Sequence, residues 1–438
     1  MRFFALLFVL PVVIASAAAA QQEPPVLRAK SPSVDVQDGP RLRRGVWTVD
    51  PSVALDVFNA GRSDKPRTIT FISDIDRLSF EVVPNQVYDF VVLLDNQHRC
   101  ATRISTFVQP FSPIKPGAAP GPVAIPFSFD QARIMVSVNV NGSEPLDLLF
   151  DTGADATVIS TKTLAKGVTA RVDGTQSHQG FGGTSISQSA SDNTIELAGI
   201  RWTHEPILWT DGPVIAGDGI LGAHVFEDKV VEIDFDRRLL IVHDALPSNA
   251  ATFTELPMQG LGRTFSIETS LAGARSSGTV PVFFDSGFAG ALMVYHASDQ
   301  AMGLRATLSR VGRSFTSGTG RGGINCDVLV LPELSIAGRT FKDLPIHVED
   351  PGTNAPSGYE GGVLGMDVIK RFNLILDYPR DRAYFSPNTL MGSPYSITVP
   401  PPPVGAIVAL AALPVGMAFG AVWYRARRAR LRGVAAAA

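Results

Sequence analysis

Hydrophobic and polar positions alternate along much of this chain with a period close to two. Segments such as RIMVSVNVNG place an apolar side chain at about every second position, and frequent glycines separate such segments. A period of two is typical of β-strands that bury one face. Helical patterns are brief and occur chiefly just after Gly222 and Gly365. The pattern therefore predicts a mostly β protein.

Short strand-like runs fill residues 41–110, namely RTITFI, LSFEVV, YDFVVLLD and CATRISTFV. Turn-forming residues separate these runs, and their spacing predicts a small antiparallel β accessory domain. It contains no catalytic constellation, so a packing, docking or prodomain-like role is the simplest interpretation. Residues 21–40 are polar and contain prolines, and residues 111–123 are rich in Pro, Gly and Ala. Both stretches are predicted to be linkers.

The N-terminal sequence MRFFALLFVLPVVIASAAAA has one arginine, an apolar core and small residues at its end. These features predict a signal peptide over residues 1–20 and an exported protein.

The C-terminal end suggests a membrane anchor. Residues 404–424 carry no charge and end in Trp-Tyr, and five arginines follow within residues 425–438. Such a pattern predicts a single transmembrane helix, a basic cytoplasmic tail and a body outside the cytoplasm, periplasmic or extracellular. Residues 391–403 end in four prolines and are predicted to form a stalk. A removable C-terminal sorting signal is the alternative, because such signals have the same order of blocks.

Two triplets stand in matching contexts. Asp151-Thr152-Gly153 follows the apolar run LDLLF, and Asp285-Ser286-Gly287 follows TVPVFF. Each is followed, further along the chain, by an apolar-apolar-Gly sequence, ILG in the first case and VLG in the second.

Further landmarks keep the same register. An apolar-Ala-Gly sequence, a Pro-Ile pair and a strand-like run containing aspartate recur in the same order after each triplet, and the offset grows only in small steps. Such self-similarity predicts an internal duplication of about 120 residues. We therefore expect two homologous halves, a first lobe over residues 124–250 and a second over residues 251–390.

One aspartate from each half can supply one half of a shared active site. Two carboxylates about 3 Å apart cannot both ionise cheaply, so they share a proton. One then acts as general base on a water while the other polarises a peptide carbonyl. Gly153 and Gly287 permit tight turns, and the hydroxyls of Thr152 and Ser286 can hydrogen-bond between the halves. Asp151 and Asp285 are thus the candidate catalytic residues.

These segments resemble the aspartic peptidases of the pepsin and retropepsin type. The matching residues are FDTGADATVIS and GILGAHVF in the first half, and FDSGFAGALMV and GVLGMDVI in the second. The resemblance implies a bilobal, mostly β fold with Asp151 and Asp285 as the dyad, and the 134-residue spacing is more like two fused retropepsin units. Phe288 departs from the family pattern, where a small residue is commoner, and no pepsin-like flap tyrosine is present.

Two glycine-rich segments are candidate flaps that close over a substrate. The first contains Phe181, Gly182 and Gly183, and the second contains Gly318 and Gly320. The alternative for both is an ordinary surface loop.

Charge and motifs limit the other chemistries. The net charge is −3, so no basic field recruits nucleic acid, and no zinc-protease or serine-nucleophile motif occurs. We expect no cofactor or metal, a peptide or protein substrate, and a single chain that builds the dyad without a dimer. Cys100 and Cys326 either form one disulfide or remain two buried thiols.

The sequence thus predicts a membrane-anchored aspartic endopeptidase. A catalytically inactive peptide-binding protein on the same fold is the main alternative. A third possibility is that the module at 41–110 recruits a partner while the lobes serve as scaffold.

Overall fold

The computed structural model describes residues 23–397 apart from short gaps, which are 40, 53–54, 109–110, 115–120, 131, 182, 212–215, 262–263, 274–276, 319–321 and 353–360. The expected signal peptide, transmembrane span (404–424) and basic tail (425–438) lie outside the described residues. Within the described part of the chain, no helix is long and apolar enough to span a membrane. Strands dominate the described residues, as the sequence predicts.

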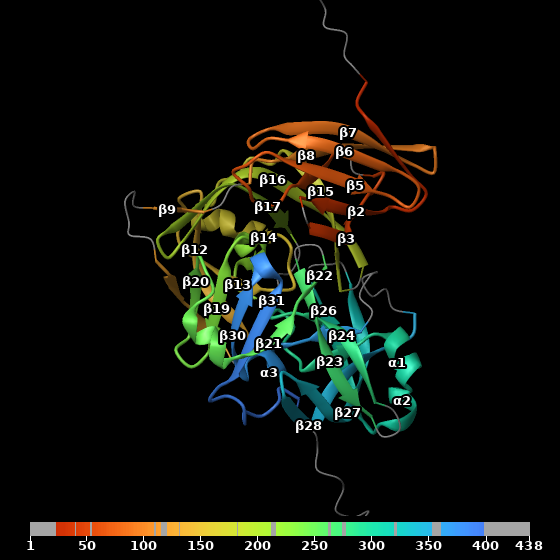
Figure 1. Ribbon diagram of the computed structural model, residues 1–438, viewed down its shortest axis with the longest axis vertical. Coiled ribbons are helices and arrows are strands. Elements are labelled where there is room, and N and C mark those ends of the chain that lie inside the picture. Colours follow the sequence, from red (N-terminus) through yellow and green to blue (C-terminus); the bar gives the residue numbers. More distant parts are fainter. Residues whose placement is uncertain are drawn as a thin grey trace, which may run out of the picture.

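The N-terminal part of the chain forms two four-stranded sheets (Figure 1). One sheet has the order β1 (Val26–Ala29), β7 (Val87–Leu94), β8 (His98–Ser105), β4 (Asp56–Asn59), and the other has the order β3 (Arg41–Thr48), β2 (Ser33–Asp38), β5 (Arg67–Ile72), β6 (Arg77–Val82). The aromatic rings of Trp47, Phe71 and Phe90 meet between them, with the last two ring centroids 4.8 Å apart. This N-terminal domain therefore has a hydrophobic core of its own.

The prediction of a linker over residues 21–40 is wrong. Strands β1 and β2 lie within it and belong to the N-terminal domain. Leu27 and Ala29 alternate with exposed residues in β1, as Val34 and Val36 do in β2, and all four are buried. This burial stabilises both short strands although the segment is polar overall.

Each of the next two parts of the chain forms one large sheet, and the two sheets have the same strand order. The sheet of the first lobe runs β11 (Ser128–Phe129), β12 (Ile134–Val140), β13 (Leu146–Asp151), β18 (Gly219–Gly222), β14 (Thr157–Ser160), β17 (Ile200–Thr210), β16 (Gly183–Leu197), β15 (Gly174–Gly180), with β9 (Ser112–Pro113) paired to β17. The sheet of the second lobe runs β22 (Gln259–Leu261), β23 (Thr264–Ala272), β24 (Ser277–Phe284), β29 (Gly362–Leu364), β25 (Leu292–Val294), β28 (Arg339–Glu349), β27 (Gly323–Ile336), β26 (Arg310–Ser317).

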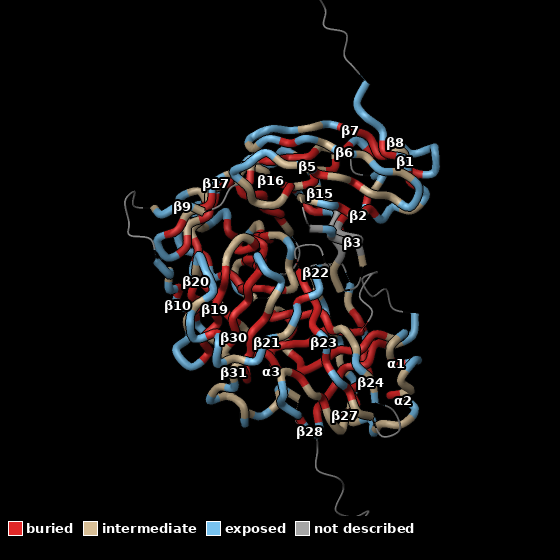
Figure 2. Tube along the Cα trace, in the orientation of Figure 1, coloured by how far each residue is buried: buried red, intermediate tan, exposed pale blue. Residues whose placement is uncertain are grey.

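A six-stranded sheet joins the two lobes. Its order is β10 (Val123–Pro126), β20 (Leu239–His243), β19 (Val230–Asp234), β30 (Phe372–Asp377), β31 (Arg382–Pro387), β21 (Thr254–Pro257). The central antiparallel pair joins one strand of each lobe, with Val231 opposite Leu376. One buried hydrophobic cluster runs through both lobes, and Figure 2 shows the buried residues concentrated there. The lobes are therefore packed as one body.

Helices are short and lie at the ends of strands. Two follow the glycines that the sequence singled out, namely η2 (Ala223–Phe226) after Gly222 and α3 (Met366–Ile369) after Gly365. The others are η1 (Thr161–Lys166), η3 (Ser248–Thr252), η4 (Tyr378–Arg380), α1 (His296–Met302) and α2 (Leu304–Thr307). The sequence pattern did not predict α1 and α2.

The stalk expected over residues 391–403 is also corrected in its first part. Residues 391–397 lie against α3, and Ser396 donates two hydrogen bonds to the buried carboxylate of Asp367. The remaining stalk residues, 398–403, lie outside the described residues. Cys100 and Cys326 are both buried and free, so they form no disulfide with each other.

Candidate active site

Both triplets lie at the end of a buried strand. Asp151 is the last residue of β13, and Asp285 directly follows β24. In each lobe this strand pairs in parallel with the strand that carries the ILG or VLG sequence, so that Asp151 lies opposite Gly222 and Phe284 opposite Leu364. A strand buried on both faces reads as a continuous apolar run, and the sequences LDLLF and VPVFF fit this position.

Hydrogen bonds join the two turns across the lobe interface. The Thr152 hydroxyl donates to the Phe284 carbonyl, and the Ser286 hydroxyl donates to the Phe150 carbonyl, both at 2.9 Å. In return each hydroxyl oxygen accepts the backbone N–H of the other residue, also at 2.9 Å. All four groups are buried, so the turns are fixed relative to one another.

The two carboxyl groups lie against each other. Each accepts a hydrogen bond at 2.7 Å from the glycine N–H of its own triplet. A Cβ placed on Gly153 would lie 2.7 Å from Cγ of Asp285, and one on Gly287 would lie 2.5 Å from Oδ2 of Asp151. Only glycine fits at both positions, because the partner carboxyl occupies the space of a side chain.

Burial raises the pKa of both carboxyl groups. The pKa of Asp285 is raised further, because the charge of Asp151 adds to the effect of burial. The hydrogen bond between the two carboxyl groups lowers the pKa of Asp151 and raises that of Asp285. The pair therefore retains one shared proton over a range of pH.

The pair opens into a cleft of about 1130 Å³. Both turns line it, together with residues of the two lobes such as Trp209 in the first and His347 in the second. Phe288, the residue that departs from the family pattern, is buried in an apolar cluster of the second lobe. Its ring packs edge-on against the His347 ring, with the two ring centroids 5.4 Å apart. Its backbone N–H donates to Asp285 at 3.1 Å. Phe288 is thus accommodated without displacing the second turn.

Both glycine-rich segments belong to β-hairpins over the cleft. In the first lobe β15 and β16 pair up to Gly180 and Gly183, and in the second lobe β26 and β27 pair up to Ser317 and Gly323. The hairpins meet, since a Cβ on Gly318 would lie 3.4 Å from the backbone nitrogen of Phe181. Phe181 also packs against the apolar cluster around Phe288. Gly182 and Gly320 lie outside the described residues.

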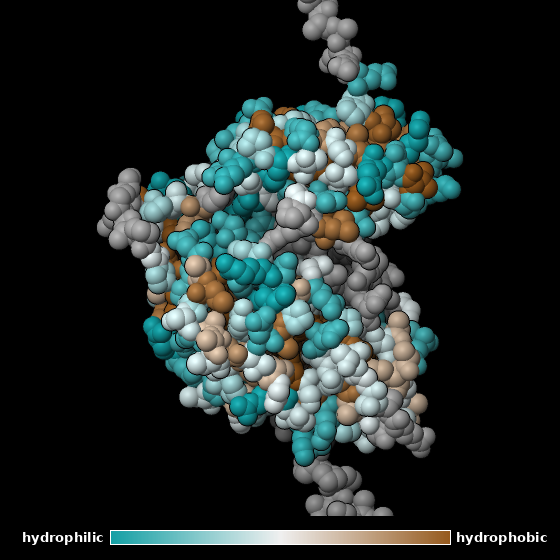
Figure 3. Space-filling view, in the orientation of Figure 1, coloured by the Kyte–Doolittle hydropathy of each residue, from teal (hydrophilic) through white to brown (hydrophobic). Residues whose placement is uncertain are grey.

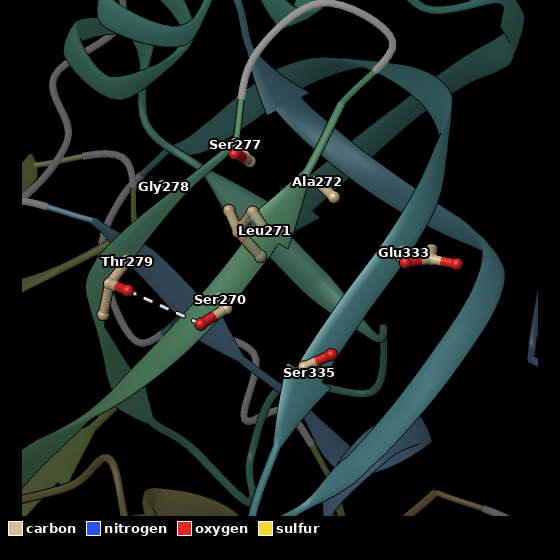
Figure 4. Close-up of a pocket in the computed structure, with 8 residues that line it drawn as sticks. All are labelled: Ser270, Leu271, Ala272, Ser277, Gly278, Thr279, Glu333 and Ser335. Carbon is tan, nitrogen blue, oxygen red and sulfur yellow. Dashed lines mark hydrogen bonds between the residues drawn. The ribbon is translucent and has the colours of Figure 1, made fainter.

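A second, smaller hollow lies on the second lobe, and unlike the cleft it contains no pair of acidic side chains. It has a volume of about 220 Å³ between β23, β24 and β27 (Figure 4). Ser270 and Thr279 point toward each other there, with their hydroxyls 3.5 Å apart, and Glu333 is its one ionisable side chain. Among the described residues, no three His, Cys, Asp or Glu side chains come together so as to hold a metal ion.

The sequence patterns did not indicate His347, which lines the cleft, or its hydrogen-bond partner Ser314. Ser314 lies on β26 and His347 on β28, on either side of β27, and the serine Oγ lies 2.7 Å from Nδ1 of the imidazole. Burial lowers the pKa of His347, which favours the neutral ring. The two residues are far apart in sequence, and no motif contains them.

A second missed feature lies where the N-terminal domain meets the first lobe. The guanidinium of Arg62 pairs with the carboxylate of Glu205, and both side chains are fully buried. Its Nε donates to the His224 carbonyl of η2 at 3.3 Å, and its backbone N–H donates to Glu227 at 2.7 Å. The N-terminal domain also lies over the β15 strand, and Figure 3 shows an indentation between this domain and the body below it.

Comparison with known proteins shows a similarity over part of the chain. Among solved structures, the aspartic proteinase from Irpex lacteus is similar, with 15% identity, a TM-score of 0.43 and an alignment covering 62% of this chain and 99% of that one. No curated protein sequence matches the chain. A sequence model of the family described as "Aspartyl protease" matches residues 136–225, which include Asp151 and Gly222. The resemblance found in the sequence is thereby confirmed for residues 136–225, which are similar to this family.

Proposed function

We propose that the protein is an aspartic endopeptidase in which Asp151 and Asp285 activate water together. The observation that supports this most directly is the contact of two buried carboxyl groups at the floor of a cleft. Each comes from a different lobe, and the lobes share one strand order. We infer that a duplication produced them, so that one chain supplies both carboxyl groups without a partner subunit.

The proposed reaction uses the unequal pKa values of the pair. Ionised Asp151 takes a proton from water as the water oxygen bonds to the peptide carbon, while Asp285 gives its proton to the carbonyl oxygen. In the second step Asp151 protonates the leaving nitrogen, the C–N bond breaks, and Asp285 recovers a proton from the hydroxyl that becomes the new carboxyl group. Each aspartate ends in its starting state.

The pH dependence follows from this scheme. Activity requires one proton on the pair, so it falls when Asp285 loses its proton at high pH and when Asp151 gains one at low pH. Because the pKa of Asp285 is raised strongly, the alkaline limit lies well above the ordinary pKa of aspartate.

The test is cleavage of a mixed peptide library from acid to neutral pH by the full chain. We expect the parent to cut internal peptide bonds and Asp151→Asn and Asp285→Asn each to lose at least about a thousandfold in rate. Asp147→Asn is the matched control, because this aspartate lies on the same strand but is exposed to solvent. Binding of peptides without cleavage by the parent would instead support the inactive peptide-binding protein.

Export and anchoring are separate parts of the proposal. The apolar runs at 1–20 and 404–424 support a body outside the cytoplasm and a single anchor with a cytoplasmic C-terminus. The test is membrane fractionation and protease accessibility of the C-terminus in intact cells. A mature chain that lacks residues beyond the stalk, measured by mass spectrometry, would support the removable sorting signal.

A further inference from the structure

After its last strand, the chain returns to the helix that supports the second turn. Strand β31 ends at Pro387, and Asn388 then donates from its backbone to the Arg371 carbonyl at 3.1 Å and from its side chain to the Lys370 carbonyl at 2.9 Å. These contacts direct the following residues along α3 instead of away from the body. The segment 391–397 is outside the repeated part of the fold.

Arg371 holds the first part of this segment. Its guanidinium, which is buried, donates to the carbonyls of Met391 and Ser393, the second at 2.6 Å. The same group lies over the ring of Tyr395, 4.5 Å from its centroid. A guanidinium that binds two carbonyls and one ring fixes the direction of the chain.

Asp367 holds the end of the segment. Its Oδ2 accepts the backbone N–H of Ser396 at 2.7 Å and the Ser396 hydroxyl at 2.6 Å, while Oδ1 accepts Nζ of Lys370 at 2.7 Å. Asp367 is 1% exposed, so these are strong bonds away from water. Its backbone N–H also donates to the Gly290 carbonyl in the loop after Asp285. One residue thus contacts both the C-terminal segment and the second turn.

Ser396 and Ile397 line the same cleft as the two aspartates. Ile397 is half-buried and offers an apolar surface there. We propose that the segment 391–397 forms one wall of the substrate cleft and that Ile397 is a specificity-determining residue, with Ser396 and Asp367 as its positioning residues. This inference rests on the proposed peptidase function.

In this proposal the wall contacts one side chain of the bound peptide and limits how large that side chain can be. A pocket discriminates between substrates by about tenfold or more per methylene when it is well packed. Shortening Ile397 therefore admits a larger apolar side chain at one peptide position, and enlarging Ile397 excludes it. The other peptide positions and the dyad remain as they are.

The test compares cleavage profiles of the full chain on one peptide library, read by mass spectrometry. We expect Ile397→Ala to raise kcat/KM about tenfold for the bulkiest apolar residues at one position, and Ile397→Phe to lower it there. Ser396→Ala removes one of the two hydrogen bonds from Ser396 to Asp367, and we expect it to change kcat/KM at the same peptide position by a smaller factor. Leu246→Ala is the matched control, since this exposed residue lies away from the cleft lining.

Profiles that superimpose for all four variants and the parent would overturn the inference. If the parent cleaves nothing, the proposed function fails. The wall can still be tested by immobilising the parent and each variant on an affinity support and identifying the library peptides that each one retains. A change in retained peptides at one position for the Ile397 variants, and not for Leu246→Ala, supports the wall. Identical retained sets overturn it.

Discussion

The two lobes are alike in their strands and differ in what lies against the turn that carries each aspartate. In the first lobe, η2 follows Gly222, and its His224 carbonyl accepts a hydrogen bond from Arg62 of the N-terminal domain. In the second lobe, α3 follows Gly365 and is covered by the C-terminal segment 391–397. The repeated fold brings the two aspartates together, but the N-terminal domain supports one turn and the C-terminal segment supports the other.

The two supports also differ in their chemistry. Glu205 in the first lobe pairs with a guanidinium from a separate domain, with both side chains fully buried. Asp367 in the second lobe has a local partner, Lys370, and two further hydrogen bonds from Ser396. The first support therefore depends on a single residue of another domain, Arg62, whereas the second shares its hydrogen bonds among several groups.

Arg62→Met is expected to have the largest effect on stability. It leaves the Glu205 carboxylate buried without its cation, which costs about 3–5 kcal/mol in the free energy of unfolding. The double variant Arg62→Met/Glu205→Leu recovers most of this loss. In the second lobe Lys370→Met costs less, because Ser396 still donates twice to Asp367. Denaturant unfolding measures all three, and an equal loss for both single variants would contradict the contrast between the supports.

Gly153→Ala and Gly287→Ala test whether the lobes contribute equally to the dyad. A methyl group at either position overlaps the carboxyl group of the other lobe, and a displacement of about 1 Å costs about a hundredfold in rate. We expect a loss of that size in kcat for both variants, with peptide binding less affected. Gly278→Ala, which has open space around its Cβ position, is the control. Loss in one lobe alone would show that the turns are not equivalent.

The N-terminal domain carries a pH dependence of its own. Burial raises the pKa of Asp56 to about 6, although this carboxylate accepts a hydrogen bond from Trp47. A raised pKa means that the folded state binds the proton more tightly, so stability falls as pH rises from about 4 to 6. Asp56→Asn should therefore be more stable than the parent by roughly 2–3 kcal/mol at pH 7 and by little at pH 4. A difference between the two chains that does not change with pH would contradict this assignment.

Thr152→Val and Ser286→Ala should have the smallest effects of these variants. Each removes one hydroxyl from the lobe interface and leaves a buried N–H without its acceptor, which costs about 1–2 kcal/mol in stability. Because the hydrogen bonds are matched, the two losses should be nearly equal. Thermal unfolding measures them, and a clear inequality would indicate that one lobe dominates the interface.

The sequence was sufficient to predict the repeated part of the fold. Alternating apolar positions marked the strands, and two triplets with matching landmarks indicated Asp151 and Asp285, which the structure brings together. Local patterns are visible in sequence because a strand buries every second side chain. The strands expected within 41–110 likewise coincide with β5 to β8.

The supports of the two turns could not be predicted in the same way. Arg62 and Glu205 lie 143 residues apart and have no repeating context, so nothing local distinguishes them from surface charges. The segments 21–40 and 391–397 are polar or rich in proline, and their order comes from the surfaces on which they pack. Helix α1 is one short element without a side-chain cap, which leaves little signal in the sequence.

The position of Ile397 also has a consequence for the proposed membrane anchor. Only residues 398–403 separate Ile397 from the apolar run at 404–424. A fully extended chain of that length reaches about 25 Å at most. If the apolar run is an anchor, the cleft is held within that reach of the lipid surface, and the N-terminal domain lies at the far end of the molecule from the point where the chain leaves (Figure 1). The protein would then cut polypeptide segments that lie close to the bilayer and leave distant ones intact.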